Sequence, residues 1–151
     1  MDENCPNWKS YGEKHIDKVL FLSLVRDQLT RDRGRDADCV PMFRSGARGS
    51  LFKVRLTSHG YTLVAKGMQS ADQQFLRHET TMYDRLIGIQ GVHIPVCIGN
   101  LELVRPWHCD GRVNFHFMFL SWAGRSLLDC AVCFNEVVVA DGVAKIFTAM
   151  H

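Results

Sequence analysis

The sequence of 151 residues has no long apolar run and no large excess of one charge. No stretch approaches the roughly 18 uncharged apolar residues of a membrane-spanning helix, so we expect no membrane segment. Eighteen basic and 16 acidic residues leave a net charge of +2, which is too small to favour a nucleic-acid or membrane partner. A hydrophobic content of 46% and the absence of low-complexity tracts exclude a chain that is disordered throughout.

The first eight residues, Met1 to Trp8, lack the basic-then-apolar pattern of a signal peptide. We therefore expect an intracellular protein, cytoplasmic or nuclear. In that setting its six cysteines are expected to be reduced thiols rather than a disulfide framework.

Apolar periodicity predicts alternating helices and strands. Residues 1–14 are polar and resemble a loosely attached arm, and a helix is expected from about 15 to 29. Two apolar stripes are expected on that helix, one through Ile16, Val19, Leu20, Ser23, Leu24 and Gln28 and one through Leu22, Val25 and Leu29. The mixed charges of 30–38 indicate a solvated loop.

The middle of the chain is expected to be mostly β-structure. We expect two strands within 42–56 around a glycine turn at 45–49, a strand at 61–65, a helix at 71–87, strands at 93–98, 101–105 and 113–120, and helices at 127–133 and 136–150. Hairpin turns are expected at Gly99-Asn100 and Asp110-Gly111. Phe115, Phe117 and Phe119 alternate, which predicts a core face with His116 and Met118 on the other side. This order indicates an α+β domain.

Residues 39–71 contain no acidic residue. The cations of this segment are Arg44, Arg48, Lys53, Arg55 and Lys66. Gly46 and Gly49 would let backbone N–H groups approach a phosphate closely, because glycine has no Cβ. A strand lysine one hairpin later, Lys66, could reach the same phosphate, and Glu79 in the following helix could hold that lysine in place.

The segment from Arg44 to Val54 resembles the glycine-rich loop of protein kinases, with Gly46 and Gly49 as two of its three glycines and Arg44 in place of the first. Leu51-Phe-Lys-Val resembles the continuation of that loop, and Leu63-Val-Ala-Lys66 resembles the strand with the ATP-binding lysine.

Three further segments extend the resemblance. His78-Glu79-x-x-Met-Tyr-x-x-Leu is similar to the kinase αC helix, and Ile94-Pro-Val followed by Gly99 is similar to the strand entry after it. Phe119-Leu120-Ser121-Trp-Ala123-Gly-Arg-Ser-Leu127 resembles the last strand of the lobe and the hinge.

The resemblance implies a kinase-like N-lobe over 39–127, with an antiparallel five-stranded sheet and an αC-type helix. It implies an N-terminal arm and helix over 1–38 and, over 128–151, the start of a C-lobe with αD/αE-type helices. It also implies an ATP site formed by Gly46, Gly49, Leu51, Lys66, Glu79, Leu120, Ser121 and Ala123. In it, Leu120 would lie behind the adenine, and the backbone of 121–123 would bind the base.

The sequence has no His-Arg-Asp loop and no Asp-Phe-Gly. The resemblance therefore implies a truncated, pseudokinase-like chain, similar to divergent kinase-like proteins of filamentous fungi. We expect no catalytic residues, ATP binding at most, a possible regulatory role, and Mg²⁺ only with a complete second lobe.

Several alternatives stay open. The chain could be an interaction module without nucleotide, which self-associates or binds a protein partner through apolar surface such as Val137 to Val139, Ile146 and Phe147. It could also be a fragment of a small-molecule phosphotransferase. Lys66 and Glu79 could be an ordinary surface ion pair, and Gly46 and Gly49 a plain turn.

Cysteine chemistry is not favoured. Cys130 and Cys133 have zinc-knuckle spacing and His108-Cys109 could complete a site, but no second well-spaced pair is present. A nucleophilic pair of Cys97 with His93 or His116 is not marked by any motif. We therefore expect ordinary thiols and no zinc.

Overall fold

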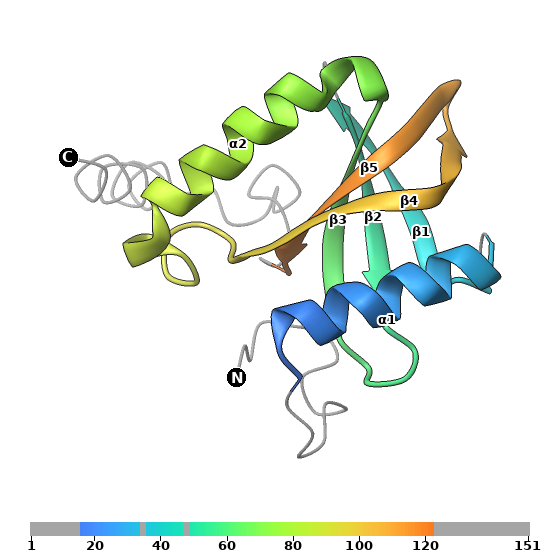
Figure 1. Cartoon of the computed structure of the whole chain (residues 1–151), viewed down its shortest axis with the longest axis horizontal. Helices are drawn as coiled ribbons and strands as arrows, with labels where there is room; N and C mark the ends of the chain where they lie inside the picture. The colour runs from blue at the N-terminus through green and yellow to red at the C-terminus, as the bar shows by residue number, and fades with distance from the viewer. Residues whose placement is uncertain (1–15, 34–35, 47–48, 123–151) are drawn as a thin grey trace, which may run out of the picture.

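The structure is a computed structural model that describes residues 16–33, 36–46 and 49–122. Along the chain it contains α1 (Lys18–Arg31), β1 (Cys39–Gly46), β2 (Gly49–Arg55), β3 (Thr62–Met68), the short 3-10 helix η2 (Ser70–Asp72), α2 (Gln73–Arg85), the 3-10 helix η3 (Ile87–Ile89), β4 (Cys97–Cys109) and β5 (Arg112–Ser121) (Figure 1). No described helix combines the length and the apolar character that crossing a bilayer requires.

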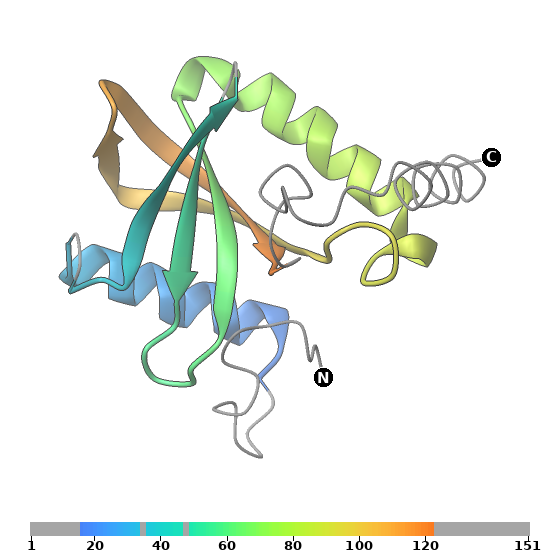
Figure 2. The same cartoon turned by 180° about the vertical axis from the view of Figure 1, so that it is seen from behind.

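The strands form one antiparallel five-stranded sheet in the order β1-β2-β3-β5-β4. The predicted α+β class and the antiparallel sheet are therefore confirmed. Seen from behind, β1, β2 and β3 cross in front of α1, whereas α2 extends to their upper right (Figure 2). Because β5 lies between β3 and β4, the segment that carries α2 must pass over the sheet.

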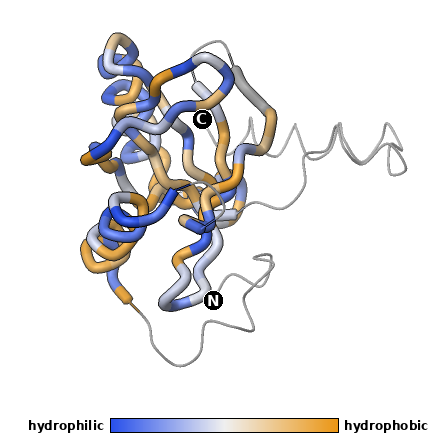
Figure 3. Tube along the Cα trace, turned by 90° about the vertical axis from the view of Figure 1, so that its right-hand side faces the viewer, coloured by the Kyte–Doolittle hydropathy of each residue, from blue (hydrophilic) through white to orange (hydrophobic). Residues whose placement is uncertain are grey.

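Alternating strand residues divide the core into two clusters, one on each face of the sheet. Phe52, Ala65 and Phe117 belong to the larger cluster, which α1 covers through Phe21 and Val25. Met68 and Met118 belong to the smaller cluster, which α2 covers through Leu76. The two helices thus pack on different faces, and each alternates hydrophilic and hydrophobic residues along its turns (Figure 3).

Helix α1 begins where the Asp17 carboxylate accepts a hydrogen bond of 2.7 Å from the Leu20 N–H, as an N-cap does. Its buried residues are Phe21, Val25, Gln28 and Leu29. The first predicted stripe is wrong at Val19 and Leu20, which are 78% and 45% exposed. Its other apolar members, Ile16 and Leu24, pack against the core, as does the second predicted stripe of Leu22, Val25 and Leu29. This helix carries apolar residues on all sides, so periodicity alone did not identify the face that packs against the sheet.

The predicted turn at Gly99-Asn100 is also wrong. Both residues lie inside β4, where the register shifts between Cys97 and Gly99 as in a β-bulge. The expected strand at 93–98 begins only at Cys97. The turn at Asp110-Gly111 is confirmed, with φ of 48° and 71°, and it joins β4 to β5.

The predicted core face of β5 is correct in part. Phe117 and Phe119 are fully buried, but Phe115 is 37% exposed. Met118, which was expected opposite the core, is also fully buried because α2 covers that face. The predictions for the 1–14 arm, the helices at 127–133 and 136–150, Cys130 and Cys133, and the apolar surface from Val137 onward lie outside the described residues.

Candidate functional site

Lys66 and Glu79 form an ion pair across the α2 face of the sheet. The Lys66 Nζ lies 2.5 Å from the Glu79 Oε2, and the two side chains are 27% and 29% exposed. Lys66 is on β3 and Glu79 is in the middle of α2, so the pair joins the sheet to the helix. The sequence placed these two residues together, and the structure does so.

The glycine turn lies beside this lysine. Gly46 and Gly49 are register partners at the end of the β1–β2 hairpin. A Cβ on Gly49 would lie 2.9 Å from the Gly67 carbonyl oxygen and 3.4 Å from Lys66 side-chain carbons. Glycine is therefore required at Gly49 for close packing, and its backbone borders the lysine.

Apolar side chains continue the same face next to Lys66. Leu51 lies across from Lys66 on β2, and Val64 lies between Lys53 on β2 and Leu120 on β5. Leu51, Val64 and Leu120 are each half-buried. We call these three residues the apolar patch; it is bounded by Lys66 at one end and by Lys53 at the other.

At the end of β5, Ser121 is already hydrogen-bonded. Its N–H donates to the Val96 carbonyl (2.8 Å), and its Oγ accepts from the Val96 N–H (2.9 Å). The Ser121 N–H is therefore engaged by Val96, and the predicted base contacts of the backbone of 121–123 stay a prediction. Ala123 lies outside the described residues.

Trp122 follows Ser121 and reaches across the sheet. The Lys53 Nζ lies 5.3 Å from the centre of the indole ring, a cation–π distance. Since Lys53 pairs with Val64, the indole extends toward the far end of the apolar patch. The sequence reasoning missed this contact, because Lys53 and Trp122 lie far apart in the chain.

A second connection between α2 and the sheet was also missed. The Asn100 side-chain amide donates a hydrogen bond of 2.7 Å to the Thr80 Oγ1. Thr80 immediately follows Glu79, and its hydroxyl in turn donates to the Leu76 carbonyl (2.8 Å). The contact was missed because Gly99-Asn100 was predicted to be a turn, whereas both residues lie inside β4.

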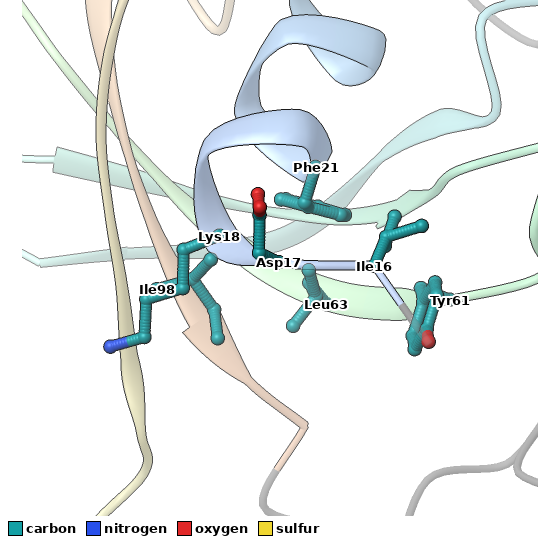
Figure 4. Close-up of a pocket in the computed structure, with 7 residues that line it drawn as sticks. All are labelled: Ile16, Asp17, Lys18, Phe21, Tyr61, Leu63 and Ile98. Atoms are coloured by element: carbon teal, nitrogen blue, oxygen red, sulfur yellow. The ribbon is translucent and has the colours of Figure 1, made fainter. Parts of the chain in front are cut away.

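A separate apolar pocket of about 110 Å³ lies on the α1 side of the sheet (Figure 4). It is lined by Ile16, Asp17, Lys18, Phe21, Tyr61, Leu63 and Ile98. Its two charged residues are engaged elsewhere: Asp17 caps α1, and the Lys18 Nζ donates to the Cys97 carbonyl (3.1 Å). The pocket therefore offers little to an anionic ligand and is distinct from the Lys66 face.

The described cysteines are protonated at neutral pH. Burial is the main cause that raises the pKa of the Cys39, Cys97 and Cys109 thiols above the ordinary value. Within 16–33, 36–46 and 49–122, no group of three or more His, Cys, Asp or Glu side chains could hold a metal ion.

Together these features define an α+β domain in which a strand lysine, paired with a helix glutamate, lies between a glycine turn and an apolar patch. The protein is similar to "Meiotic driver SPOK2" of Podospora anserina, with 32% identity over 133 residues. That match covers 83% of this chain but 17% of the relative, so the chain spans about a sixth of the relative's length. No family model and no solved structure matches the chain.

Proposed function

We propose that residues 39–122 form a kinase-like nucleotide-binding lobe and that ATP binds on the face that carries Lys66. In this proposal, Lys66 binds the phosphates, Glu79 orients the lysine, and Gly46 and Gly49 border the phosphates from the hairpin. The single observation that carries the proposal is the Lys66–Glu79 pair at 2.5 Å beside Gly49.

The electrostatics of the segment support a phosphate ligand. The chain from Cys39 to Ala71 contains cations and no acidic residue, so Glu79 is a counter-charge supplied from outside that segment. Among the described cations, Arg55 pairs with Asp38 and Lys66 with Glu79, whereas Lys53 contacts the Trp122 indole, so a polyphosphate could supply negative charge on this face. Lys66 stays 27% exposed, so its Nζ is within reach of a ligand.

The apolar patch supports a purine at the other end of that ligand. Leu51, Val64 and Leu120 come from three neighbouring strands and share one face with Lys66. Half-buried aliphatic side chains can pack against one side of a flat base. The strand order β1-β2-β3-β5-β4, with a helix inserted after the lysine strand, also supports the kinase-like assignment.

An interaction module without nucleotide is the alternative, and one observation favours it. On edge strand β1, Val40 is 47% exposed and Phe43 is 81% exposed, and Phe43 has a φ of 51° that bulky residues rarely adopt. An exposed aromatic held in an unfavourable conformation at a sheet edge suits contact with a partner protein.

Equilibrium titration with ATP, with and without Mg²⁺, tests the nucleotide proposal. Wild type is expected to bind ATP with a submillimolar dissociation constant, and Lys66→Ala is expected to lose that binding. Arg77→Ala is the control, because it removes one positive charge from an exposed position on α2. The absence of binding at several millimolar ATP, or equal binding by Lys66→Ala, would overturn the proposal and leave the interaction module.

A further inference from the structure

Helix α2 is attached to the sheet at two successive residues. Glu79 accepts from Lys66 on β3, and Thr80 accepts from Asn100 on β4. These strands lie on opposite sides of β5 in the sheet, so the two bonds diverge from the helix. Successive helical residues point about 100° apart, so two such bonds fix the rotation of the helix about its axis.

The β-bulge of β4 is what presents Asn100 to the helix. Cys97 pairs with Leu120 and Gly99 pairs with Phe119, which leaves Ile98 as the extra residue. An extra residue moves the side chains that follow it, up to the next register shift between Glu102 and Trp107, to the other face of the sheet. Asn100 consequently lies across from Met118, which is in the α2 cluster. Without the bulge it would face α1.

Helix α1 packs on the same bulge from the other face. The Lys18 Nζ donates to the Cys97 carbonyl, and a Cβ on Gly99 would lie 3.0 Å from the Leu22 Cδ1. Gly99 has a φ of 145°, a conformation that favours glycine. The conformation of Gly99 and the packing of α1 therefore stabilise the bulge independently of the Asn100–Thr80 bond.

We propose that Asn100 is a positioning residue, which fixes α2 through Thr80 so that Glu79 faces Lys66. This inference rests on the proposed function, in which Glu79 orients the lysine that binds phosphate. The contact itself can be tested without nucleotide.

Thr80→Val removes the hydroxyl at almost constant shape, and Thr80→Ser retains it. Thr81→Val is the matched control, because Thr81 also donates to the carbonyl four residues earlier but is exposed on α2. Asn100→Leu is a second route, since leucine has a similar shape and no polar group that could bond to the Thr80 hydroxyl.

The readout is the nuclear Overhauser effect between the Lys66 Hε and Glu79 Hγ protons, measured in each variant. We expect this signal in wild type, Thr80→Ser and Thr81→Val, and at least a threefold loss in Thr80→Val and Asn100→Leu. An unchanged signal in Thr80→Val or in Asn100→Leu overturns the inference, as does its absence from wild type.

ATP titration of the same variants separates the inference from the proposed function. If ATP binds, Thr80→Val is expected to weaken binding three- to tenfold, whereas Thr81→Val leaves it unchanged. If ATP does not bind wild type but the Overhauser signal falls in Thr80→Val, the positioning role stands and the nucleotide proposal fails. Equal ATP affinity in Thr80→Val and Thr81→Val overturns the positioning role.

Discussion

Gln28 fastens α1 to the turn between β2 and β3 with one buried side chain. Its Nε2 donates to the Ala37 and Arg55 carbonyls at 2.7 and 2.8 Å, and its Oε1 accepts from the Thr57 N–H and Oγ1. Only 4% of the residue is exposed. A buried polar side chain that is fully satisfied in this way contributes to a specific docking geometry, because shifting the helix would break all four bonds.

We expect Gln28→Met to lower the free energy of unfolding by about 2–4 kcal/mol, because the partners in the turn lose their bonds in a partly buried site. Urea denaturation measures the change, and Gln74→Met, exposed on α2, is the matched control. A loss equal to that of the control would show that the four bonds do not stabilise the fold.

Cys39 is a buried thiol whose protonation depends on the fold. Burial raises its pKa far above the ordinary value, with the nearby Cys109 as a smaller cause. Below the ordinary thiol pKa of about 8.5, folded and unfolded chains are both protonated and the contribution to stability is complete. Above it the unfolded chain loses the proton while the folded chain keeps it, so stability falls as pH rises.

The expected result is a fall in the free energy of unfolding of up to about 1.4 kcal/mol per pH unit from this thiol above pH 8.5. Urea denaturation of wild type and Cys39→Ala between pH 7.5 and 10 measures it. The variant is expected to show a shallower decline, although it is less stable at neutral pH because it leaves a small cavity. Parallel curves for the two proteins would contradict the assignment.

At the scale of elements, one inserted residue in β4 determines which side chains of the strand contact each of the two helices. Ile98 is the extra residue of its bulge and packs with the α1 cluster, whereas Asn100 faces α2. Gly99 adopts a φ of 145° within this bulge. The conformation of one glycine therefore sets the face on which β4 presents its side chains from Asn100 to Glu102, where the register shifts again.

Gly99→Ala is expected to destabilise the protein by about 1–3 kcal/mol, because the new Cβ is strained at this φ and meets Leu22. Thermal or urea denaturation measures the effect. Gly88→Ala is the control, since a Cβ there meets nothing within 4 Å. Equal stability of the two variants would argue against a bulge that requires glycine.

The two helices differ in how firmly they are held. Helix α1 buries Phe21, Val25, Gln28 and Leu29, whereas α2, which is described along its whole length, buries Leu76 alone. The attachment of α2 depends more on the polar contacts of Glu79 and Thr80. Such a helix opens at a lower free energy than one with a broad apolar face.

Hydrogen–deuterium exchange is expected to show faster exchange in α2 than in α1, with the slowest exchange in the central strands β3 and β5. The comparison is internal, because both helices are measured in one sample. Protection of α2 equal to that of β3 would contradict the account of its attachment.

The sequence predicted elements well where a pattern was local. The alternation of 51–56, the helix at 71–87 and the Asp110-Gly111 turn were confirmed, apart from a few residues at their ends. The pairing of Lys66 with Glu79 was also foreseen. Gly99-Asn100 could not be resolved, because a glycine with unusual φ has the same local signature in a hairpin turn as in a bulge. The Asn100–Thr80 and Lys53–Trp122 contacts depend on tertiary packing.

At the scale of the whole molecule, the sheet separates two kinds of surface. One face packs against α1 through the larger core cluster and carries the pocket beside Ile16. The other face carries Lys66, the glycine hairpin and the apolar patch next to α2. Stability is concentrated on the first face, and the proposed binding chemistry on the second.

The most direct test is a map of backbone amide chemical shifts during titration with ATP. We predict shifts concentrated at Gly49, Leu51, Val64, Lys66 and Leu120, with α1 unaffected. The same map of Lys66→Ala is expected to show no such shifts. Shifts confined to the α1 pocket, or no shifts at several millimolar ATP, would contradict the claim that the Lys66 face binds a nucleotide.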